Sequence, residues 1–384
     1  MPRKQLPVHS PVTAGSVAAA FIASATGGER ARTRVLELVR AEYGPRDLLL
    51  LDSGTSALML ALRAVCREAG TAGRAPLVAL PAYGCFDLAT AAVGANARVV
   101  LYDLDPATLG PDWPSLERAL AHRPAAVVVA HLYGVPVDVA RVARLAAAID
   151  AVVIDDAAQG VGASIAGRPL GSFGSLGILS FGRGKGRTGG GGGALLANDE
   201  RGADLLARVR GEVAAPERGL RAAVMLKAQW LLGRPSLYWI PASLPFLGLG
   251  ETPYRAPHPA LSMAAASLGA LAATWDESTR EIVHRREAAA AWRRSTMVQG
   301  WSIPESDATA AVRGELRLAV VLPPDQHSSN VAARLGGGVM PGYPVTLAHL
   351  PALADRLQHP EPMPGADALT QRLVTLPCHR HAIS

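Results

Sequence analysis

The stretch AVVVAHLYGVPVDVARVARLAAAIDAVVI, residues 126–154, decides the fold of this chain. It contains an apolar run (Ala126–Ala130), a helix-like segment (Val137–Ala148) and a second apolar run (Val152–Ile154). Short continuous apolar runs are typical of strands buried on both faces. A helix between two such strands indicates a parallel sheet covered by helices.

The same alternation extends over the first half of the chain. The other apolar runs are Leu48–Leu51, Leu77–Leu80, Val99–Leu104, Ile178–Phe181 and Ala194–Ala197. Further helix-like stretches are Ser56–Glu68, Asp87–Val93 and Trp113–Ala121. We therefore predict an α/β fold: a mostly parallel seven-stranded sheet flanked by helices, with a smaller C-terminal α+β domain.

The character of the sequence changes after Asn198. Residues 201–260 are rich in Leu, Trp and Pro, and a long helix is predicted from Leu261 to about Arg294. We divide the chain into an N-terminal arm (1–30), a large α/β domain (31–200), a helical and Pro-rich insert (201–260), and a long helix with a small C-terminal domain (261–384).

Composition and charge exclude several classes of protein. The chain has 384 residues, of which 49% are hydrophobic and 18% charged, which is typical of a globular protein. The net charge of +6 is modest. The arginines are scattered, and no basic tract alternates with aromatic residues, so we expect no nucleic-acid partner.

The cysteines and the N-terminal residues indicate the cellular compartment that we expect. Three cysteines are too few and too scattered for a disulfide framework or a metal site, so we expect a reducing compartment and no metal. The first residues lack the apolar core of a signal peptide. Charges and prolines interrupt the apolar region 222–250. We therefore expect a cytoplasmic protein without membrane contact.

One lysine stands out from the rest of the chain. Only Lys4, Lys185 and Lys227 occur, and Lys185 lies in the glycine-rich segment SFGRGKGRTGGGGG, residues 180–193. A lysine can lose its proton and attack a carbonyl, whereas an arginine cannot. Lys185 is therefore a candidate for covalent chemistry, and a flexible surface loop is the alternative interpretation. A Walker phosphate loop is excluded, because Leu179 and Gly186 stand where that motif requires Gly and Ser or Thr.

Three other segments follow predicted strands, where ligands bind in open α/β sheets. DSGTSA (52–57) opens a helix and is either an anion site or a plain N-cap. DDAAQG (155–160) places a carboxylate at a strand end, where it needs a cationic partner or caps a helix. PAYGCF (81–86) carries aromatic residues that could stack on a flat ligand or belong to the core. A phosphate cradle, an aromatic plate, a carboxylate and a lysine together fit one cofactor, pyridoxal 5'-phosphate.

The chain resembles the DegT/DnrJ/EryC1/StrS family of sugar aminotransferases, which are fold type I pyridoxal-phosphate enzymes. The matching stretches are SGTSAL (53–58), LPAY (80–83), HLYG (131–134), DDAAQ (155–159) and LSFGRGK (179–185). The resemblance is good over about residues 45–200 and weaker beyond them.

The resemblance implies a role for each matched residue. Lys185 would hold the cofactor as a Schiff base and then move a proton, Asp156 would pair with the pyridinium nitrogen, and Gln159 would contact the ring hydroxyl. The phosphate would be held by Gly54, Thr55, Ser56 and Ser180. Phe86, or else Tyr83, would stack on the ring. The candidates for substrate contact are Arg183, Arg187 and His349, although the two arginines could equally be solvent-facing loop charges.

The activity that the resemblance implies is transfer of an amino group, from glutamate, to a keto sugar. The sugar would be nucleotide-linked and serve polysaccharide or secondary-metabolite biosynthesis. The partners would be these small molecules and a second copy of the chain in a homodimer. Two alternatives stay open: another lysine-dependent reaction or a non-sugar acceptor, and a non-catalytic, cofactor-bound regulator or membrane-associated accessory protein. The apolar region 201–260 suggests the second alternative.

Overall fold

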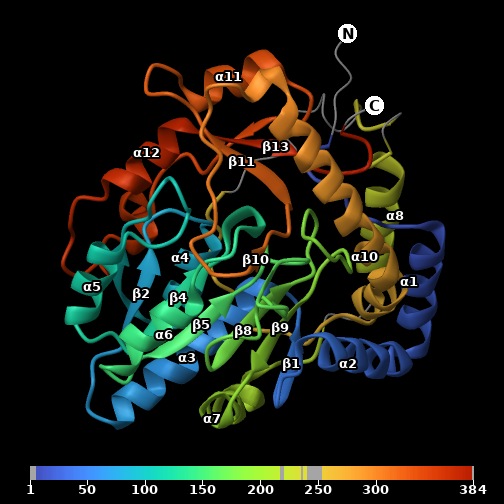
Figure 1. Ribbon diagram of the computed structural model, residues 1–384. Helices are drawn as coiled ribbons and strands as arrows, with labels where there is room; N and C mark the ends of the chain where they lie inside the picture. The colour runs from blue at the N-terminus through green and yellow to red at the C-terminus, as the bar shows by residue number, and fades with distance from the viewer. Residues whose placement is uncertain (1–5, 217–219, 235–236, 240–252, 383–384) are drawn as a thin grey trace.

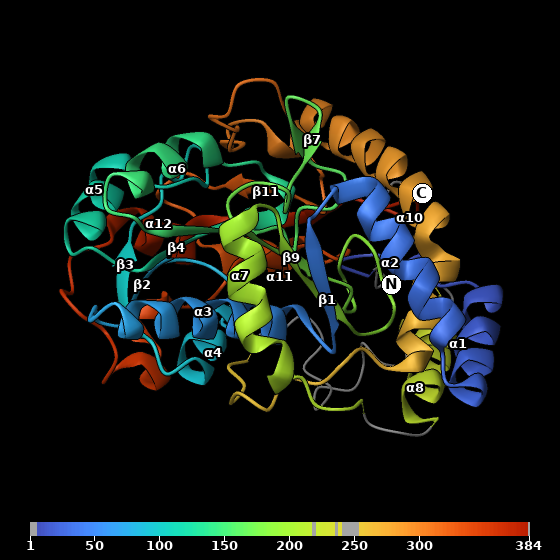
Figure 2. The ribbon, with the colours of Figure 1, turned by 90° about the horizontal axis from the view of Figure 1, so that it is seen from below.

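A central sheet covered by helices on both faces forms the body of the molecule (Figures 1 and 2). The structure is a computed structural model that describes residues 6–216, 220–234, 237–239 and 253–382. The strands of the seven-stranded sheet, in spatial order, are β1 (Asp47–Leu51), β9 (Gly193–Ala197), β8 (Leu176–Ser180), β5 (Val152–Asp156), β4 (Ala126–Ala130), β2 (Leu77–Pro81) and β3 (Arg98–Tyr102). Strand β9 is antiparallel to both of its neighbours, and the other pairs are parallel. The predicted mostly parallel sheet is thus confirmed.

The apolar strands are buried on both faces because successive side chains point to opposite sides. In β1, Leu49 and Leu51 pack in one core cluster, whereas Leu48 and Leu50 pack in another. One face is covered by α3 (Gly54–Thr71), α4 (Asp87–Gly94) and α7 (Glu200–Val209). The opposite face is covered by α2 (Glu29–Tyr43), α5 (Trp113–Ala121) and α6 (Val139–Ala147). This double burial explains why the runs are continuous and do not alternate with polar residues.

The register of the parallel strands gathers their carboxyl ends at one edge. Asp156 of β5 pairs with Ala130 of β4 and with Ile178 of β8. The residues that follow these strands therefore lie beside one another, although they are far apart in the sequence. The first turn of α3 reaches the same edge, because Ser53 bridges to Gly192 just before β9.

The C-terminal part is a smaller α+β region, as predicted. Its sheet contains β11 (Arg317–Val321), β13 (Leu373–Pro377) and β12 (Met340–Pro341), and its helices are α11 (Ser328–Leu335) and α12 (Pro364–Arg372). A second small sheet contains β10 (Ala311–Val312), β6 (Ser164–Ile165) and β7 (Arg168–Pro169). The short helical turns are η1 (Leu132–Gly134), η2 (Arg210–Glu212), η4 (Thr296–Val298), η5 (Leu347–His349) and η6 (Pro351–Leu353).

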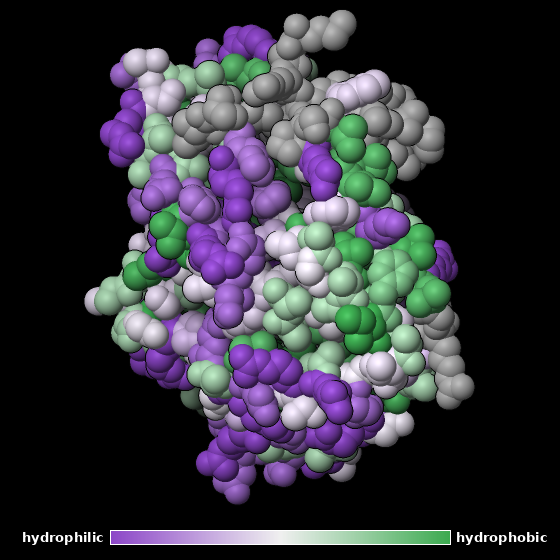
Figure 3. All heavy atoms as spheres, turned by 90° about the vertical axis from the view of Figure 1, so that its right-hand side faces the viewer, coloured by the Kyte–Doolittle hydropathy of each residue, from purple (hydrophilic) through white to green (hydrophobic). Residues whose placement is uncertain are grey.

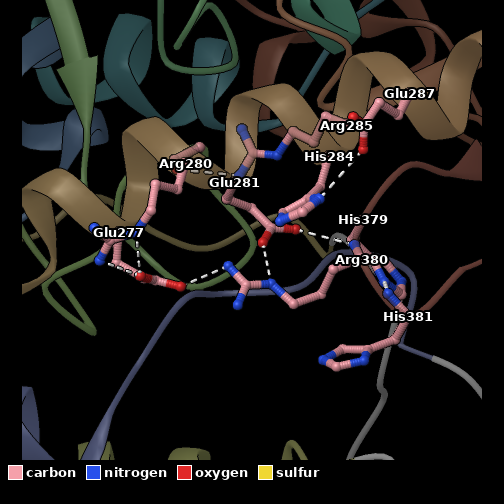
Figure 4. Close-up of polar contacts among 10 residues, drawn as sticks. Glu277, Arg280, Glu281, His284, Arg285, Glu287, His379, Arg380 and His381 are labelled. Carbon is pink, nitrogen blue, oxygen red and sulfur yellow. Dashed lines mark hydrogen bonds and ion pairs between the residues drawn. The ribbon is translucent and has the colours of Figure 1, made fainter.

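The long helix α10 (Ala265–Arg294) joins the two regions (Figure 1). Near the chain end, Arg380 binds two acids of this helix (Figure 4). Its Nη2 lies 2.6 Å from Glu277 Oε1, and its Nε lies 2.6 Å from Glu281 Oε2. These ion pairs fix the C-terminal segment to the middle of α10.

Two further helices pack on the start of α10. They are α1 (Ala14–Thr26) and α8 (Arg221–Leu232), and their contact is apolar. On the outer face, Ile22, Val224 and Met225 are 63%, 52% and 53% exposed, and apolar side chains gather on this side of the molecule (Figure 3). The predicted insert at 201–260 holds α7 and α8, and part of it lies outside the described residues. None of the described helices is long and apolar enough to cross a lipid bilayer.

Candidate active site

A pocket opens at the edge of the sheet where the parallel strands end. Its walls come from the start of α3, the β2–α4 connection and the segments that follow β4, β5 and β8. The lining residues are Gly54, Thr55, Leu58, Cys85, Asp87, Leu88, Ala130, His131, Leu132, Asp156, Ala158, Gln159, Ile178, Ser180 and Lys185.

The structure brings together much of the site predicted from the sequence. The predicted residues that line this pocket are Gly54, Thr55, Asp156, Gln159, Ser180 and Lys185. The predicted residues outside its lining are Ser56, Tyr83, Phe86, Arg183, Arg187 and His349.

The start of α3 forms one end of the pocket. Ser53 caps the helix: its Oγ accepts from Ser56 N at 3.0 Å and donates to Ser56 Oγ at 3.0 Å. A Cβ on Gly54 would lie 2.9 Å from Ser180 Cβ, so only glycine allows the end of β8 to approach this closely. The first N–H groups of a helix have no partner within the helix and attract anions. With the hydroxyls of Thr55 and Ser180, this end suits a phosphate group.

Asp155 and His131, which lines the pocket, form a buried pair. His131 Nε2 lies 2.7 Å from Asp155 Oδ1, and both side chains are 0% exposed. His131 Nδ1 accepts from Val137 N at 3.0 Å, so the ring proton is on Nε2 and is donated to Asp155. Asp155 Oδ2 accepts from Gly171 N at 2.7 Å and from Phe173 N at 2.9 Å. Both carboxylate oxygens of Asp155 therefore accept hydrogen bonds from neighbouring segments.

Asp156, the next residue, presents its carboxylate to the pocket. Its Oδ1 accepts from Ala158 N at 3.0 Å. Burial raises the pKa of Asp156, and the nearby Lys185 partly opposes that shift. A cationic group beside Asp156 would favour the charged carboxylate, and a protonated pyridine nitrogen is such a group. The carboxylate therefore fits the ring nitrogen of the expected cofactor.

The segment that carries Lys185 is anchored on several sides. Gly184 N donates to Ser10 Oγ at 3.2 Å, and Gly186 O accepts from Arg285 Nη2 at 3.1 Å. A Cβ on Gly186 would lie 2.3 Å from Val161 Cβ, so the glycine permits close packing. Lys185 itself is partly buried, and it forms no ion pair with any residue that the structure describes. Lys185 lines the pocket, where its charge acts on Asp156.

Gln159 connects the pocket to a buried aromatic cluster. Its Nε2 donates to Tyr343 Oη at 3.0 Å. Tyr83 Oη accepts from Tyr343 N at 2.9 Å, and the Phe86 ring lies 6.2 Å from the Tyr343 ring. Both candidate stacking residues, Tyr83 and Phe86, thus pack into this cluster, whereas Cys85 between them lines the pocket.

The predicted substrate residues lie away from the pocket lining. Arg187 is 2% exposed; its Nη1 binds Glu42 Oε1 at 2.5 Å, and its guanidinium lies 3.9 Å from the Trp275 ring centre. This environment favours a structural role for Arg187. Arg183 is exposed, as is His349, whose Nδ1 lies 2.9 Å from Thr346 Oγ1.

Sequence reasoning assigned no role to three pocket residues with ionisable side chains, His131, Cys85 and Asp87. His131 directly follows β4, and Cys85 and Asp87 lie in the β2–α4 connection. Their position after a strand was the available signal, because that edge of a parallel sheet binds ligands. Among the described residues, no group of three His, Cys, Asp or Glu side chains could hold a metal ion.

Comparison with known proteins confirms the resemblance. Residues 32–218 match the DegT/DnrJ/EryC1/StrS aminotransferase family. The chain is 38% identical over 148 residues to the L-glutamine:2-deoxy-scyllo-inosose aminotransferase of Streptomyces kanamyceticus. The aligned residues cover 38% of this chain and 34% of that protein. It is 35% identical over 159 residues to the UDP-N-acetyl-3-dehydro-alpha-D-glucosamine 3-aminotransferase of Acidithiobacillus ferrooxidans, covering 41% of each. The matched stretches thus span well under two thirds of these relatives.

Solved structures extend the likeness to the whole fold. The sugar aminotransferase CalS13 from Micromonospora echinospora superposes with a TM-score of 0.73 over 98% of this chain and 94% of its own. The sequence identity in that comparison is 20%, so it shows the shared fold alone.

Proposed function

We propose that this chain, whose residues 32–218 match the DegT/DnrJ/EryC1/StrS aminotransferases, is a pyridoxal-phosphate-dependent aminotransferase that acts on a keto sugar. The observation that carries the proposal is one pocket in which Lys185, Asp156 and the first turn of α3 meet. These groups offer an amine, a carboxylate and an anion cradle, which match the aldehyde, ring nitrogen and phosphate of the cofactor.

The proposed roles follow from the contacts of each side chain. When bound, the cofactor supplies an aldehyde for amino-group exchange and a ring that withdraws electrons from the substrate carbon. Gly54, Thr55 and Ser180 would bind its phosphate, and Asp156 would hold the proton on the ring nitrogen. Lys185 Nζ would anchor the cofactor and then carry a proton to and from the substrate carbon.

The neighbouring residues keep these groups in place. The Asp155–His131 pair fixes the end of β5, where Asp156 lies, to the segment after β4, which carries the lining residue Leu132. Arg285 and Ser10 hold the Lys185 segment through Gly186 and Gly184. Such fixed groups accelerate a reaction because they need little rearrangement when charge develops.

For the substrates, we propose an amino acid donor and a keto sugar acceptor, with a nucleotide-linked sugar as the first choice. Glutamate is the expected donor. Glutamine is the donor in the name of the Streptomyces kanamyceticus relative, and a nucleotide-linked sugar appears in the name of the Acidithiobacillus ferrooxidans relative. We also propose that the chain forms a homodimer, which the exposed apolar side chains on α1 and α8 support. The proposed location is the cytoplasm.

A half-reaction assay tests the proposed activity. Loaded protein mixed with glutamate or glutamine, without an acceptor, should release about one equivalent of the 2-oxo acid per site. Adding a keto sugar nucleotide should allow further turnovers. Lys185→Ala should abolish the release, whereas Lys227→Ala should not. No release with either donor, or equal release by Lys185→Ala, would refute the proposal.

A further inference from the structure

Cys85 lines the pocket, whereas Phe86 and Tyr83, which the sequence led us to expect there, do not. Among the described residues, no Phe, Tyr or Trp is part of the pocket lining, and the His131 ring in the lining is held by Asp155 and the Val137 N–H. Phe86 is 6% exposed and Tyr83 is 0% exposed, and both pack on Tyr343 with ring centres 6.2 Å and 5.4 Å away. Cys85 is partly exposed and faces the pocket.

The thiol has a defined position. Cys85 Sγ donates to Asp87 Oδ2 at 3.4 Å, and Cys85 O accepts from Leu88 N at 3.0 Å. Asp87 is the first residue of α4 and Leu88 the second, and both line the pocket as well. The start of α4 therefore holds Cys85 at the pocket wall, through the thiol and through the backbone carbonyl.

The same surroundings keep the thiol neutral. Burial and the Asp87 carboxylate raise the pKa of Cys85 to about 12, against a smaller opposite effect of Lys185. At neutral pH the group is therefore S–H and not a thiolate. A neutral, polarisable sulfur packs favourably against an aromatic ring, whereas a thiolate would compete with Lys185 for a carbonyl.

We propose that the Cys85 sulfur is the side-chain contact with the face of the cofactor ring, in the place of an aromatic plate. The inference rests on the proposed function, because it assigns a contact within the same pocket. It makes Cys85 a determinant of how tightly this chain holds its cofactor. Sulfur–ring contacts are of a strength that changes affinity about two- to tenfold.

The test is a titration of the protein with pyridoxal 5'-phosphate, followed by absorbance. Cys85→Ala and the nearly isosteric Cys85→Ser should each raise the Kd about two- to tenfold. Phe86→Leu should leave the Kd within about twofold, because Phe86 does not line the pocket. Cys66→Ala is the matched control, since it removes a sulfur that is buried in α3 outside the pocket.

The outcomes separate this inference from the proposed function. Unchanged affinity in both Cys85 variants, or a larger loss in Phe86→Leu than in either, would overturn the Cys85 contact while leaving the aminotransferase proposal intact. A wild-type chain that does not bind the cofactor would overturn both. Melting curves without cofactor show whether a variant is folded, and Cys85→Ser keeps the comparison available if Cys85→Ala is unstable.

Discussion

At the scale of single residues, the neighbouring aspartates Asp155 and Asp156 have different surroundings. Asp155 is fully buried and accepts three hydrogen bonds, from His131, Gly171 and Phe173. Asp156 is partly exposed in the pocket and accepts one, from the Ala158 N–H. The strand geometry explains the difference, because adjacent side chains in β5 point to opposite faces.

The two aspartates should therefore respond differently to the same substitution. Asp155→Asn should lower the free energy of unfolding by about 2–3 kcal/mol, because hydrogen bonds to a buried charge are lost. Asp156→Asn should leave stability nearly unchanged and lower kcat on the order of 100-fold, because the ring nitrogen loses its charged partner. Urea unfolding and steady-state kinetics of both variants measure the two effects. The account would be contradicted if Asp156→Asn were fully active.

The sequence predicted the polar residues of the pocket better than its aromatic ones. Asp156 is the last residue of β5, and Lys185 lies in the segment that follows β8, so the strand pattern was enough to place them at one edge. The choice between Tyr83 and Phe86 depended on the direction of each side chain in the β2–α4 connection. That direction is set by packing against Tyr343, which is distant in sequence, and no local pattern revealed it.

At the scale of elements, the start of α3 and the end of β8 depend on each other. Gly54 and Gly70 lie in the same helix, but their surroundings differ. A Cβ on Gly54 would lie 2.9 Å from Ser180 Cβ, whereas a Cβ on Gly70 would have no atom within 4 Å. The helix therefore needs glycine at its first residue for a close approach, and not at Gly70.

This pair of glycines gives a matched prediction. Gly54→Ala should push Ser180 away and weaken pyridoxal-phosphate binding by about tenfold, since one phosphate contact is displaced. Gly70→Ala should leave binding unchanged and stabilise the fold by about 0.5–1 kcal/mol, because alanine is the better helix former. Absorbance titration and urea unfolding give both values. Equal binding by the two variants would argue against a phosphate at this helix start.

The strands of the large sheet could be predicted from the sequence, but their order could not. Each is a continuous apolar run, and that pattern is visible locally. Their order, β1-β9-β8-β5-β4-β2-β3, depends on contacts between segments far apart in the chain. The two-residue strands β6, β7, β10 and β12 have no sequence pattern, because they are too short to show one. The glycine-rich segment around Lys185 also proved to be anchored, and not a free loop.

At the scale of the whole molecule, residues 6–10 contact both the segment 379–381 and the Lys185 segment. His379 Nε2 donates to Leu6 O at 2.9 Å, and Ser10 accepts from Gly184 N at 3.2 Å. The His9 ring lies 5.0 Å from the His381 ring and 6.1 Å from the His379 ring. Arg380, between those two histidines in sequence, binds Glu281 of α10 (Figure 4). The N-terminal arm, the C-terminal segment, α10 and the pocket thus form one connected region.

This region should make stability depend on pH. Burial lowers the pKa of His9 to about 4, against an opposite effect of Glu281, and His379, His381 and Arg380 lower it further. In the unfolded chain His9 titrates near 6.5 and takes up a proton first. The contribution of His9 to the free energy of unfolding is therefore fully present above pH 6.5 and is lost as the pH falls towards 4. Between pH 7 and pH 5, His9 should account for a loss of about 2 kcal/mol.

Urea unfolding at the two pH values measures this loss. His9→Asn, which cannot take up the proton, should show a smaller fall in unfolding free energy between pH 7 and pH 5 than the wild type. The comparison uses the change with pH within each protein, so any constant cost of the substitution cancels. Identical falls in both proteins would mean that His9 is not the group responsible.

The measurement that tests the central claim most directly is reductive trapping of the cofactor. The protein is mixed with pyridoxal 5'-phosphate, reduced with borohydride, digested and mapped by mass spectrometry. The account predicts a covalent cofactor adduct on the peptide that carries Lys185, and none on the peptides with Lys4 or Lys227. The adduct should be absent from Lys185→Arg. An adduct spread over the other lysines, or no adduct at all, would contradict the assignment of this pocket as a pyridoxal-phosphate site.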